Sequence, residues 1–133
     1  MHEFEFLLES VYRSCSYVQN ICVYADTQKA KPVALIQPHE VNIKKLAADL
    51  SVAGELETIV HDSKVQSAVL KDLLAVGRRG GLAGIELIDG VVIADDEWTP
   101  QSGLVTAAMK LNRRGLTDHY KTEIDAAYKK AGN

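Results

Sequence analysis

The sequence contains only two cysteines, Cys15 and Cys22, and no CxxC motif. They stand seven residues apart in apolar surroundings without a neighbouring histidine, which gives little support to a metal site or a redox pair. Two buried thiols in a reducing compartment are the better interpretation. The cysteines therefore indicate packing rather than chemistry.

Long hydrophobic runs are absent as well. No stretch approaches the ~18–20 consecutive apolar residues of a membrane span. The first residues, Met1–Phe4, lack the basic start of a signal peptide, and the C-terminal Ala-Gly-Asn is not a peroxisomal signal. From the residues alone we expect a soluble chain that faces the cytosol and has no transmembrane segment.

The chain has no large excess of charge of either sign. Charged residues make up 25% and the formal net charge is -3, so neither disorder nor attraction of the whole chain to nucleic acid is indicated. The charge is unevenly placed, because residues 110–133 hold six basic and three acidic residues. A mildly acidic body with a basic end suits a local anion site better than a nucleic-acid surface.

What is present is the composition of one globular domain, 133 residues of which 47% are hydrophobic. Helical spacing of apolar residues alternates with β-branched runs. The predicted helices span residues 6–13, 41–50, 63–76 and 116–129, and the predicted strands span residues 17–24, 32–36, 85–93 and 104–109. We expect Asp62 or Ser63 to cap the third helix and Gly77 to end it. The predicted fold is α+β, with a short mixed or antiparallel sheet packed with helices.

Three polar features admit a chemical role, and each has a simpler explanation. The stretch Gly77–Gly81 has the glycines and arginines of a phosphate cradle, but it lacks the GxxxxGK[ST] spacing and follows a helix, so an exposed turn is favoured. Asp95–Glu97 could hold a divalent ion, but nothing around it completes an oxygen cage, so a solvated loop is favoured. The histidines lack i, i+4 pairing, which indicates surface positions rather than metal ligands: His2, His39, His61 and His119.

Lys110 raises a sharper question. The turn-forming residues 99–103 lead into the β-prone and small residues 104–108, so the backbone there can run close to another surface. Lys110 ends this run, where a flexible stem with a compact charge can reach into a cleft and neutralise a phosphate or carboxylate. Periodicity and spacing leave two interpretations open, an anion-binding lysine and a solvated lysine at a strand end.

One segment closely resembles the C-terminal domain of long-chain fatty acyl-CoA synthetases, especially the fungal type, in the AMP-forming adenylate-forming superfamily: residues 84–116, GIELIDGVVIADDEWTPQSGLVTAAMKLNRRGL. The runs LLESVYRSCSYVQNICVYAD and KPVALIQP resemble the beginning of the same domain. The patterns ExxYRS and WTPxxGLVTAAxKLxRR occur in the right order, and the resemblance extends from about Leu7 to Tyr128.

The resemblance implies the mobile lid of a two-step ligase, whose large N-terminal adenylation domain binds ATP, Mg²⁺ and fatty acid. Fatty acid and ATP form acyl-adenylate and pyrophosphate; the lid then rotates, and the CoA thiol attacks the adenylate. Lys110 matches the lysine of the family's last motif and is expected to contact the substrate carboxylate and the α-phosphate region in a positioning and electrostatic role. Arg113 and Arg114 follow in the family's basic cluster, where they either meet nucleotide or CoA phosphates or hold the lid.

The chain also departs from the whole-enzyme pattern, since it contains no Gly/Ser/Thr-rich phosphate loop, adenine or acyl pocket, or hinge motif. We therefore expect it to be inactive alone and to bind no cofactor tightly. Residues 7–133 are assigned to the lid domain, and residues 1–6 to a junction or vector-derived segment. Ser16 stands where many relatives have proline, and Ser102 stands where many have asparagine. Both replacements are tolerable in loops.

The implied partners are the N-terminal adenylation domain and, through it, fatty acid, ATP and CoA, with no nucleic acid and no metal bound by this domain. The whole enzyme is expected to be intracellular, with endoplasmic reticulum, lipid droplets and peroxisomes as candidate membranes for peripheral attachment. Two alternatives stay open. One is a free-standing interaction or regulatory module that keeps the lid fold without catalysis, and the other is a small anion-binding protein that uses Arg78, Arg79 and the basic tail.

Overall fold

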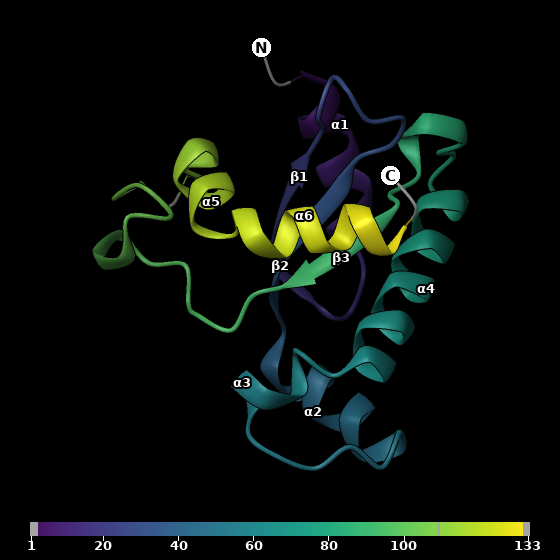
Figure 1. Ribbon diagram of the computed structural model, residues 1–133, viewed down its shortest axis with the longest axis vertical. Coiled ribbons are helices and arrows are strands. Elements are labelled where there is room, and N and C mark those ends of the chain that lie inside the picture. Colours follow the sequence, from purple (N-terminus) through teal and green to yellow (C-terminus); the bar gives the residue numbers. More distant parts are fainter. Residues whose placement is uncertain (1–2, 109, 132–133) are drawn as a thin grey trace.

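A three-stranded sheet runs through the middle of the molecule, whose computed structural model describes residues 3–108 and 110–131 (Figure 1). β1 (Val18–Tyr24) pairs antiparallel with β2 (Val33–Pro38), and β2 pairs parallel with β3 (Gly90–Ile93), so β2 is central. Its residues are an apolar run because both faces of the sheet are covered. The predicted α+β fold with a mixed sheet is confirmed.

Helices cover both faces of this sheet, and α6 crosses in front of it in Figure 1. The helices are α1 (Glu3–Tyr12), α2 (Glu40–Asp49), α3 (Leu56–Ile59), α4 (Ser63–Arg79), α5 (Arg113–His119) and α6 (Lys121–Lys130), with short 3₁₀ turns η1 (Gly84–Glu86) and η2 (Pro100–Ser102). The Asp62 side chain accepts hydrogen bonds from the amides of Lys64 and Val65, which confirms it as the cap of α4.

The strands separate two hydrophobic cores. Successive strand residues point to opposite faces, so Ile21 and Val23 enter the first core while Cys22 between them enters the second. The first core is completed by α1, α2 and α4. The second is completed by α5, α6 and the connector 94–112, through Trp98, Leu104, Val105, Leu116, Tyr120, Ile124 and Tyr128.

The end of α4 corrects one prediction, since the helix continues through Gly77 to Arg79 and is capped at Gly80. A Cβ on Gly77 would lie 2.8 Å from Tyr12 Cε1. Glycine at this position therefore serves the close approach of α1 and α4 rather than the end of the helix.

Other boundaries differ because tertiary packing replaces the local pattern. Of the strand predicted over 85–93 only Gly90–Ile93 forms, and η1 occupies 84–86. The described part of 104–109 forms no strand but one antiparallel bridge between Val105 and Leu111; Met109 lies outside the described residues. The helix predicted over 116–129 is divided at Tyr120 into α5 and α6.

At the N-terminus, α1 begins at Glu3 rather than Phe6, and α3 has no counterpart among the predicted helices. The interpretation of residues 1–6 as a junction stays a prediction, and Met1 and His2 lie outside the described residues. None of the helices within residues 3–108 and 110–131 combines the length and apolar character needed to cross a membrane.

Candidate functional site

A hollow of about 720 Å³ lies beside Lys110, where α1, β1 and the loop before α5 meet. Its lining comes from segments at both ends of the chain: Phe6, Glu9, Arg13, Asn20, Thr106, Lys110, Leu111, Asn112 and Arg113. The structure thus brings two of the three predicted site residues, Lys110 and Arg113, to one place.

Lys110 sits on the returning arm of a narrow loop. The Thr106 amide donates to the Lys110 carbonyl (2.8 Å), and the Lys110 amide donates to Thr106 Oγ1 (3.2 Å). The loop is anchored because Leu104 and Val105 are buried in the second core. The Lys110 side chain is exposed, and its Nζ forms no hydrogen bond or ion pair with the residues that the structure describes. The backbone is fixed while the charge stays available.

Asn112 closes this loop and starts α5. Its Nδ2 donates to the Gly103 carbonyl (2.8 Å), and its Oδ1 accepts from the Gly115 amide (3.1 Å) as the helix cap. Gly103 has φ +79°, a left-handed conformation that suits glycine and turns the chain into the loop. One asparagine therefore joins the loop of Lys110 to the helix that follows.

Arg113 is held in a buried ion pair. Its Nη2 and Nη1 donate to Glu9 Oε1 (2.6 Å) and Oε2 (2.7 Å), and the two side chains are 14% and 3% exposed. The guanidinium also lies over the Phe6 ring, 4.5 Å from its centroid. Glu9 Oε2 accepts a further hydrogen bond from the Val23 amide (2.7 Å). This Glu9–Arg113 brace ties α1, β1 and α5 together.

Electrostatics in the brace favour the charged form of Arg113. Burial lowers the pKa of Arg113, but the hydrogen bonds and charge of Glu9 raise it more, so the pKa lies above its ordinary value. Arg113 therefore remains a cation whose charge is already balanced by Glu9. Arg114, by contrast, is exposed and does not line the hollow.

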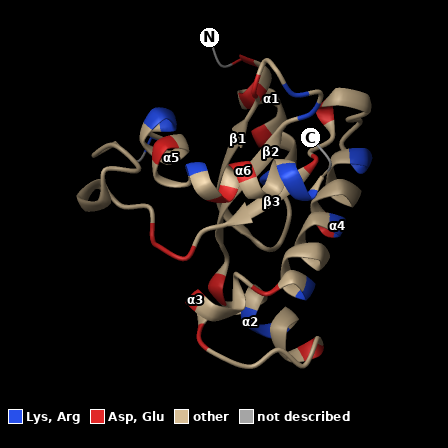
Figure 2. Cartoon of the chain, viewed as in Figure 1, with Lys and Arg blue, Asp and Glu red and all other residues tan. Residues whose placement is uncertain are grey.

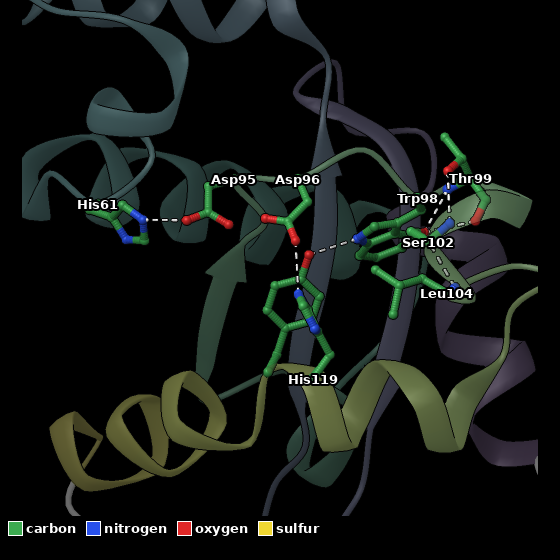
Figure 3. Close-up of polar contacts among 9 residues, drawn as sticks. His61, Asp95, Asp96, Trp98, Thr99, Ser102, Leu104 and His119 are labelled. Carbon is green, nitrogen blue, oxygen red and sulfur yellow. Dashed lines mark hydrogen bonds and ion pairs between the residues drawn. The ribbon is translucent and has the colours of Figure 1, made fainter.

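Two histidines take part in polar contacts that the sequence pattern did not reveal (Figure 3). His61 Nε2 lies 2.9 Å from Asp95 Oδ2, and His119 Nε2 lies 2.8 Å from Asp96 Oδ2. Hydrogen bonding between the adjacent carboxyl groups lowers the pKa of Asp95 and raises that of Asp96. Both histidines are exposed, as expected, but each is paired.

The acidic connector after β3, a red stretch in Figure 2, is thus tied at two points rather than simply solvated. Within residues 3–108 and 110–131, no three His, Cys, Asp or Glu side chains gather as metal ligands. Nearby, the Trp98 indole N–H donates to the Tyr120 hydroxyl (3.1 Å), and burial raises the pKa of Tyr120 to about 12.

The remaining candidate features are structural. Arg78 and Arg79 are exposed in the last turn of α4, where cations interact favourably with the helix dipole. His39 caps α2 by accepting from the Asn42 amide (3.4 Å). A second hollow, about 420 Å³ between β3, α4 and α6, contains none of the predicted site residues.

Comparison with curated proteins gives close matches. Long-chain-fatty-acid–CoA ligase 4 of Saccharomyces cerevisiae is 49% identical over 125 residues, which is 92% of this chain and 18% of that protein. Long-chain-fatty-acid–CoA ligase 1 of Schizosaccharomyces pombe is 52% identical over 124 residues, 91% of this chain and 18% of that protein. This chain is homologous to part of the fungal long-chain-fatty-acid–CoA ligases. The resemblance predicted from the sequence is confirmed.

The chain spans 18% of the length of these ligases. A comparison with models of known protein families gives no match. Among solved structures, the A-PCP didomain of carboxylic acid reductase from Segniliparus rugosus in complex with AMP superposes with a TM-score of 0.77 and 23% identity, over 95% of this chain and 16% of that chain. The A domain of the same reductase, in complex with AMP and a co-purified carboxylic acid, superposes with a TM-score of 0.74 and 25% identity, over 95% of this chain and 18% of that chain. This chain therefore shares the fold of part of an adenylation domain.

Proposed function

We propose that the chain is the C-terminal lid domain of an AMP-forming long-chain fatty acid–CoA ligase. In the first step a fatty acid carboxylate oxygen attacks the α-phosphorus of ATP and pyrophosphate leaves; in the second the CoA thiol loses its proton, its sulfur attacks the acyl carbon, and AMP leaves. The observation that supports this role is the placement of Lys110, an exposed cation on an anchored loop beside a hollow, in a chain 49% identical over 125 residues to part of a fungal ligase.

Lys110 is proposed to reach from the lid to the reacting carboxylate and α-phosphate. A preorganised cation stabilises charge that develops in the transition state, and its effect is larger in a closed, water-poor site. The four-carbon stem supplies reach, while the hydrogen bonds to Thr106 fix where that stem begins. No proton transfer is required of Lys110 in this role.

The two arginines are proposed to differ in function. Arg113 holds the lid together, because both of its terminal nitrogens, Nη1 and Nη2, donate hydrogen bonds to the Glu9 carboxylate. Arg114 is exposed and free to meet nucleotide or CoA phosphates from the outer side of α5. ATP, CoA and fatty acid are proposed to bind through the N-terminal adenylation domain. The carboxylates here offer no ready set of Mg²⁺ ligands in the described segments, so we place that ion's ligands in the adenylation domain.

A chimera tests this proposal. In a fungal ligase, this chain replaces its homologous segment, so that failure of separate halves to associate cannot obscure the result. We expect palmitoyl-CoA formation that depends on ATP and CoA. Lys110→Ala should lower adenylate formation on the order of 10²–10³-fold, with little change in stability.

Lys129→Ala is the matched control, since Lys129 is an exposed lysine in the last turn of α6, outside the hollow. It should keep full activity. A folded chimera without activity would contradict the proposal and favour the interaction module. An active chimera that tolerates Lys110→Ala would instead remove Lys110 from the chemistry.

A further inference from the structure

The hollow beside Lys110 is a positive region on a negative chain. Its charged lining consists of one acid, Glu9, and three cations, Arg13, Lys110 and Arg113, whereas the whole chain has a formal net charge of -3. A concave surface lined by one sign of charge concentrates ligands of the opposite sign. The hollow therefore suits an anion.

The three cations are not equivalent. Arg113 is paired with Glu9 through two short hydrogen bonds, so its charge is already balanced within the chain. Lys110 and Arg13 are exposed, and neither side chain forms an ion pair or hydrogen bond with the part of the chain that the structure describes. Two free charges thus face one hollow, and they come from segments 97 positions apart in the sequence.

Arg13 has a firmly placed backbone. It follows α1 directly, and its amide donates to the Glu9 carbonyl (2.9 Å). The preceding Tyr12 is buried; its hydroxyl donates to the Glu86 carbonyl (2.8 Å) and accepts from the Ile88 amide (3.1 Å). As with Lys110, the backbone is fixed and the charged end is free. A guanidinium offers paired N–H groups that match phosphate oxygens.

We propose that Arg13 and Lys110 together form a subsite for a phosphate or diphosphate group in this hollow. The anion lies between the end of α1 and the loop before α5 and is held from both sides. Asn20, whose Oδ1 is occupied by the Ile21 amide, keeps its side-chain N–H groups for the same ligand. That the group belongs to a nucleotide or to CoA rests on the proposed function; the subsite itself rests on the geometry.

The test uses inorganic pyrophosphate as the probe and the 133-residue chain as the protein, titrated at low ionic strength by amide-resolved NMR. We expect binding with shifts centred on Arg13, Asn20 and Thr106. Arg13→Gln and Lys110→Gln should each weaken binding about tenfold, the effect of one charge-assisted hydrogen bond. Unchanged amide spectra away from the hollow show that both variants fold.

Two controls match these variants in residue type. Arg79→Gln removes an exposed arginine at the end of α4, and Lys129→Gln removes an exposed lysine at the end of α6; neither lines the hollow. Both should change the dissociation constant less than about twofold. Equal weakening by all four variants would mean diffuse electrostatic attraction and overturn the subsite. Absence of any pyrophosphate binding would overturn it as well.

AMP and CoA then distinguish the source of the phosphate. Tighter binding of CoA than AMP, weakened by Arg13→Gln, assigns the subsite to CoA; the reverse order assigns it to the nucleotide. In the chimera, Arg13→Gln should raise the KM of the assigned substrate. If the chimera is inactive but pyrophosphate binding still requires Arg13, the proposed function fails and the subsite stands. If the chimera is active and neither KM changes, the subsite is overturned.

Discussion

The two faces of the sheet are built from different kinds of sequence. The first core is formed by α1, α2 and α4, whose apolar residues recur at helical spacing. The second core is covered by α5, α6 and the connector 94–112, a segment that is mostly without regular secondary structure. Much of the family pattern WTPxxGLVTAAxKLxRR is therefore packing: Trp98, Leu104 and Val105 are buried, and Lys110 is exposed. The comparison teaches that the buried residues of this pattern support the loop that carries the exposed Lys110.

The Glu9–Arg113 brace connects these two faces around β1. Glu9 lies on α1 of the first face, Arg113 begins α5 of the second, and Val23 and Cys22 of β1 touch the pair between them. Because both charges are largely shielded from water, removal of either partner leaves an uncompensated charge in a low-dielectric site.

The largest expected effect is that of Glu9→Ala. Breaking a buried ion pair costs about 3–5 kcal/mol of unfolding free energy, and the Val23 amide also loses its acceptor. Urea denaturation measures the change. Glu3→Ala is the control, an exposed glutamate on the same helix that should change the free energy by less than about 1 kcal/mol.

A milder variant, Glu9→Gln, keeps the shape of the side chain. With the single variant Arg113→Met and the double variant it forms a double-mutant cycle, which measures the coupling energy between the two side chains. The coupling energy should exceed about 1 kcal/mol. Additive single effects would show that the two faces are joined by apolar packing rather than by the brace.

An intermediate effect is expected within the second face alone. Tyr120→Phe leaves the buried Trp98 indole N–H without its acceptor, which costs about 1–3 kcal/mol. Trp98 is the only tryptophan, so its fluorescence follows the unfolding of this face. Tyr128→Phe in α6 is the matched control, since the hydrogen bond that its hydroxyl donates to the Tyr24 carbonyl is long, at 3.5 Å. Equal losses in the two variants would contradict the assignment of the indole contact.

The same contrast explains what the sequence could predict. The two antiparallel strands, α2 and the Asp62 cap of α4 follow from residues close together in the chain, and their patterns suffice. The prediction that Gly77 ends α4 is wrong because the role of this glycine depends on Tyr12, which packs against it from another helix. The last helix is divided at Tyr120, a residue whose hydroxyl accepts a hydrogen bond from Trp98, 22 positions away in the sequence.

The candidate site divides in the same way. The role predicted for Lys110 rests on the resemblance alone, because neither periodicity nor composition separates an anion-binding lysine from a solvated one. The partner of Arg113 is 104 positions away in the sequence, and the carboxylate beside His119 is 23 positions away. Such pairs have no local signal, so only the folded chain reveals that Arg113 is paired, whereas the Arg13 side chain has no ion-pair partner among the residues that the structure describes.

The smallest expected effect compares the two cores through their thiols, because Cys15 belongs to the first and Cys22 to the second. Burial raises the pKa of each from its ordinary value of 9.0 to about 12. Well below pH 9 both folded and unfolded chains keep these protons; as the pH approaches 9 and then rises towards 12, the unfolded chain releases them first, so stability falls. Between pH 7 and pH 9 the two thiols together should lower the unfolding free energy by about 1 kcal/mol.

Urea denaturation at each pH measures how steeply the unfolding free energy falls with pH. Alanine variants then show how much of this slope comes from the thiol on each face of the sheet. Cys15→Ala and Cys22→Ala should each remove about half of the fall, because the two buried thiols have similar pKa values and act independently on opposite sides of the sheet. A slope that survives in the double variant would mean that other groups titrate. A slope that disappears with Cys22→Ala alone would mean that only the second core shields its thiol from water. The two cores would then differ in their shielding from water as well as in the elements that form them.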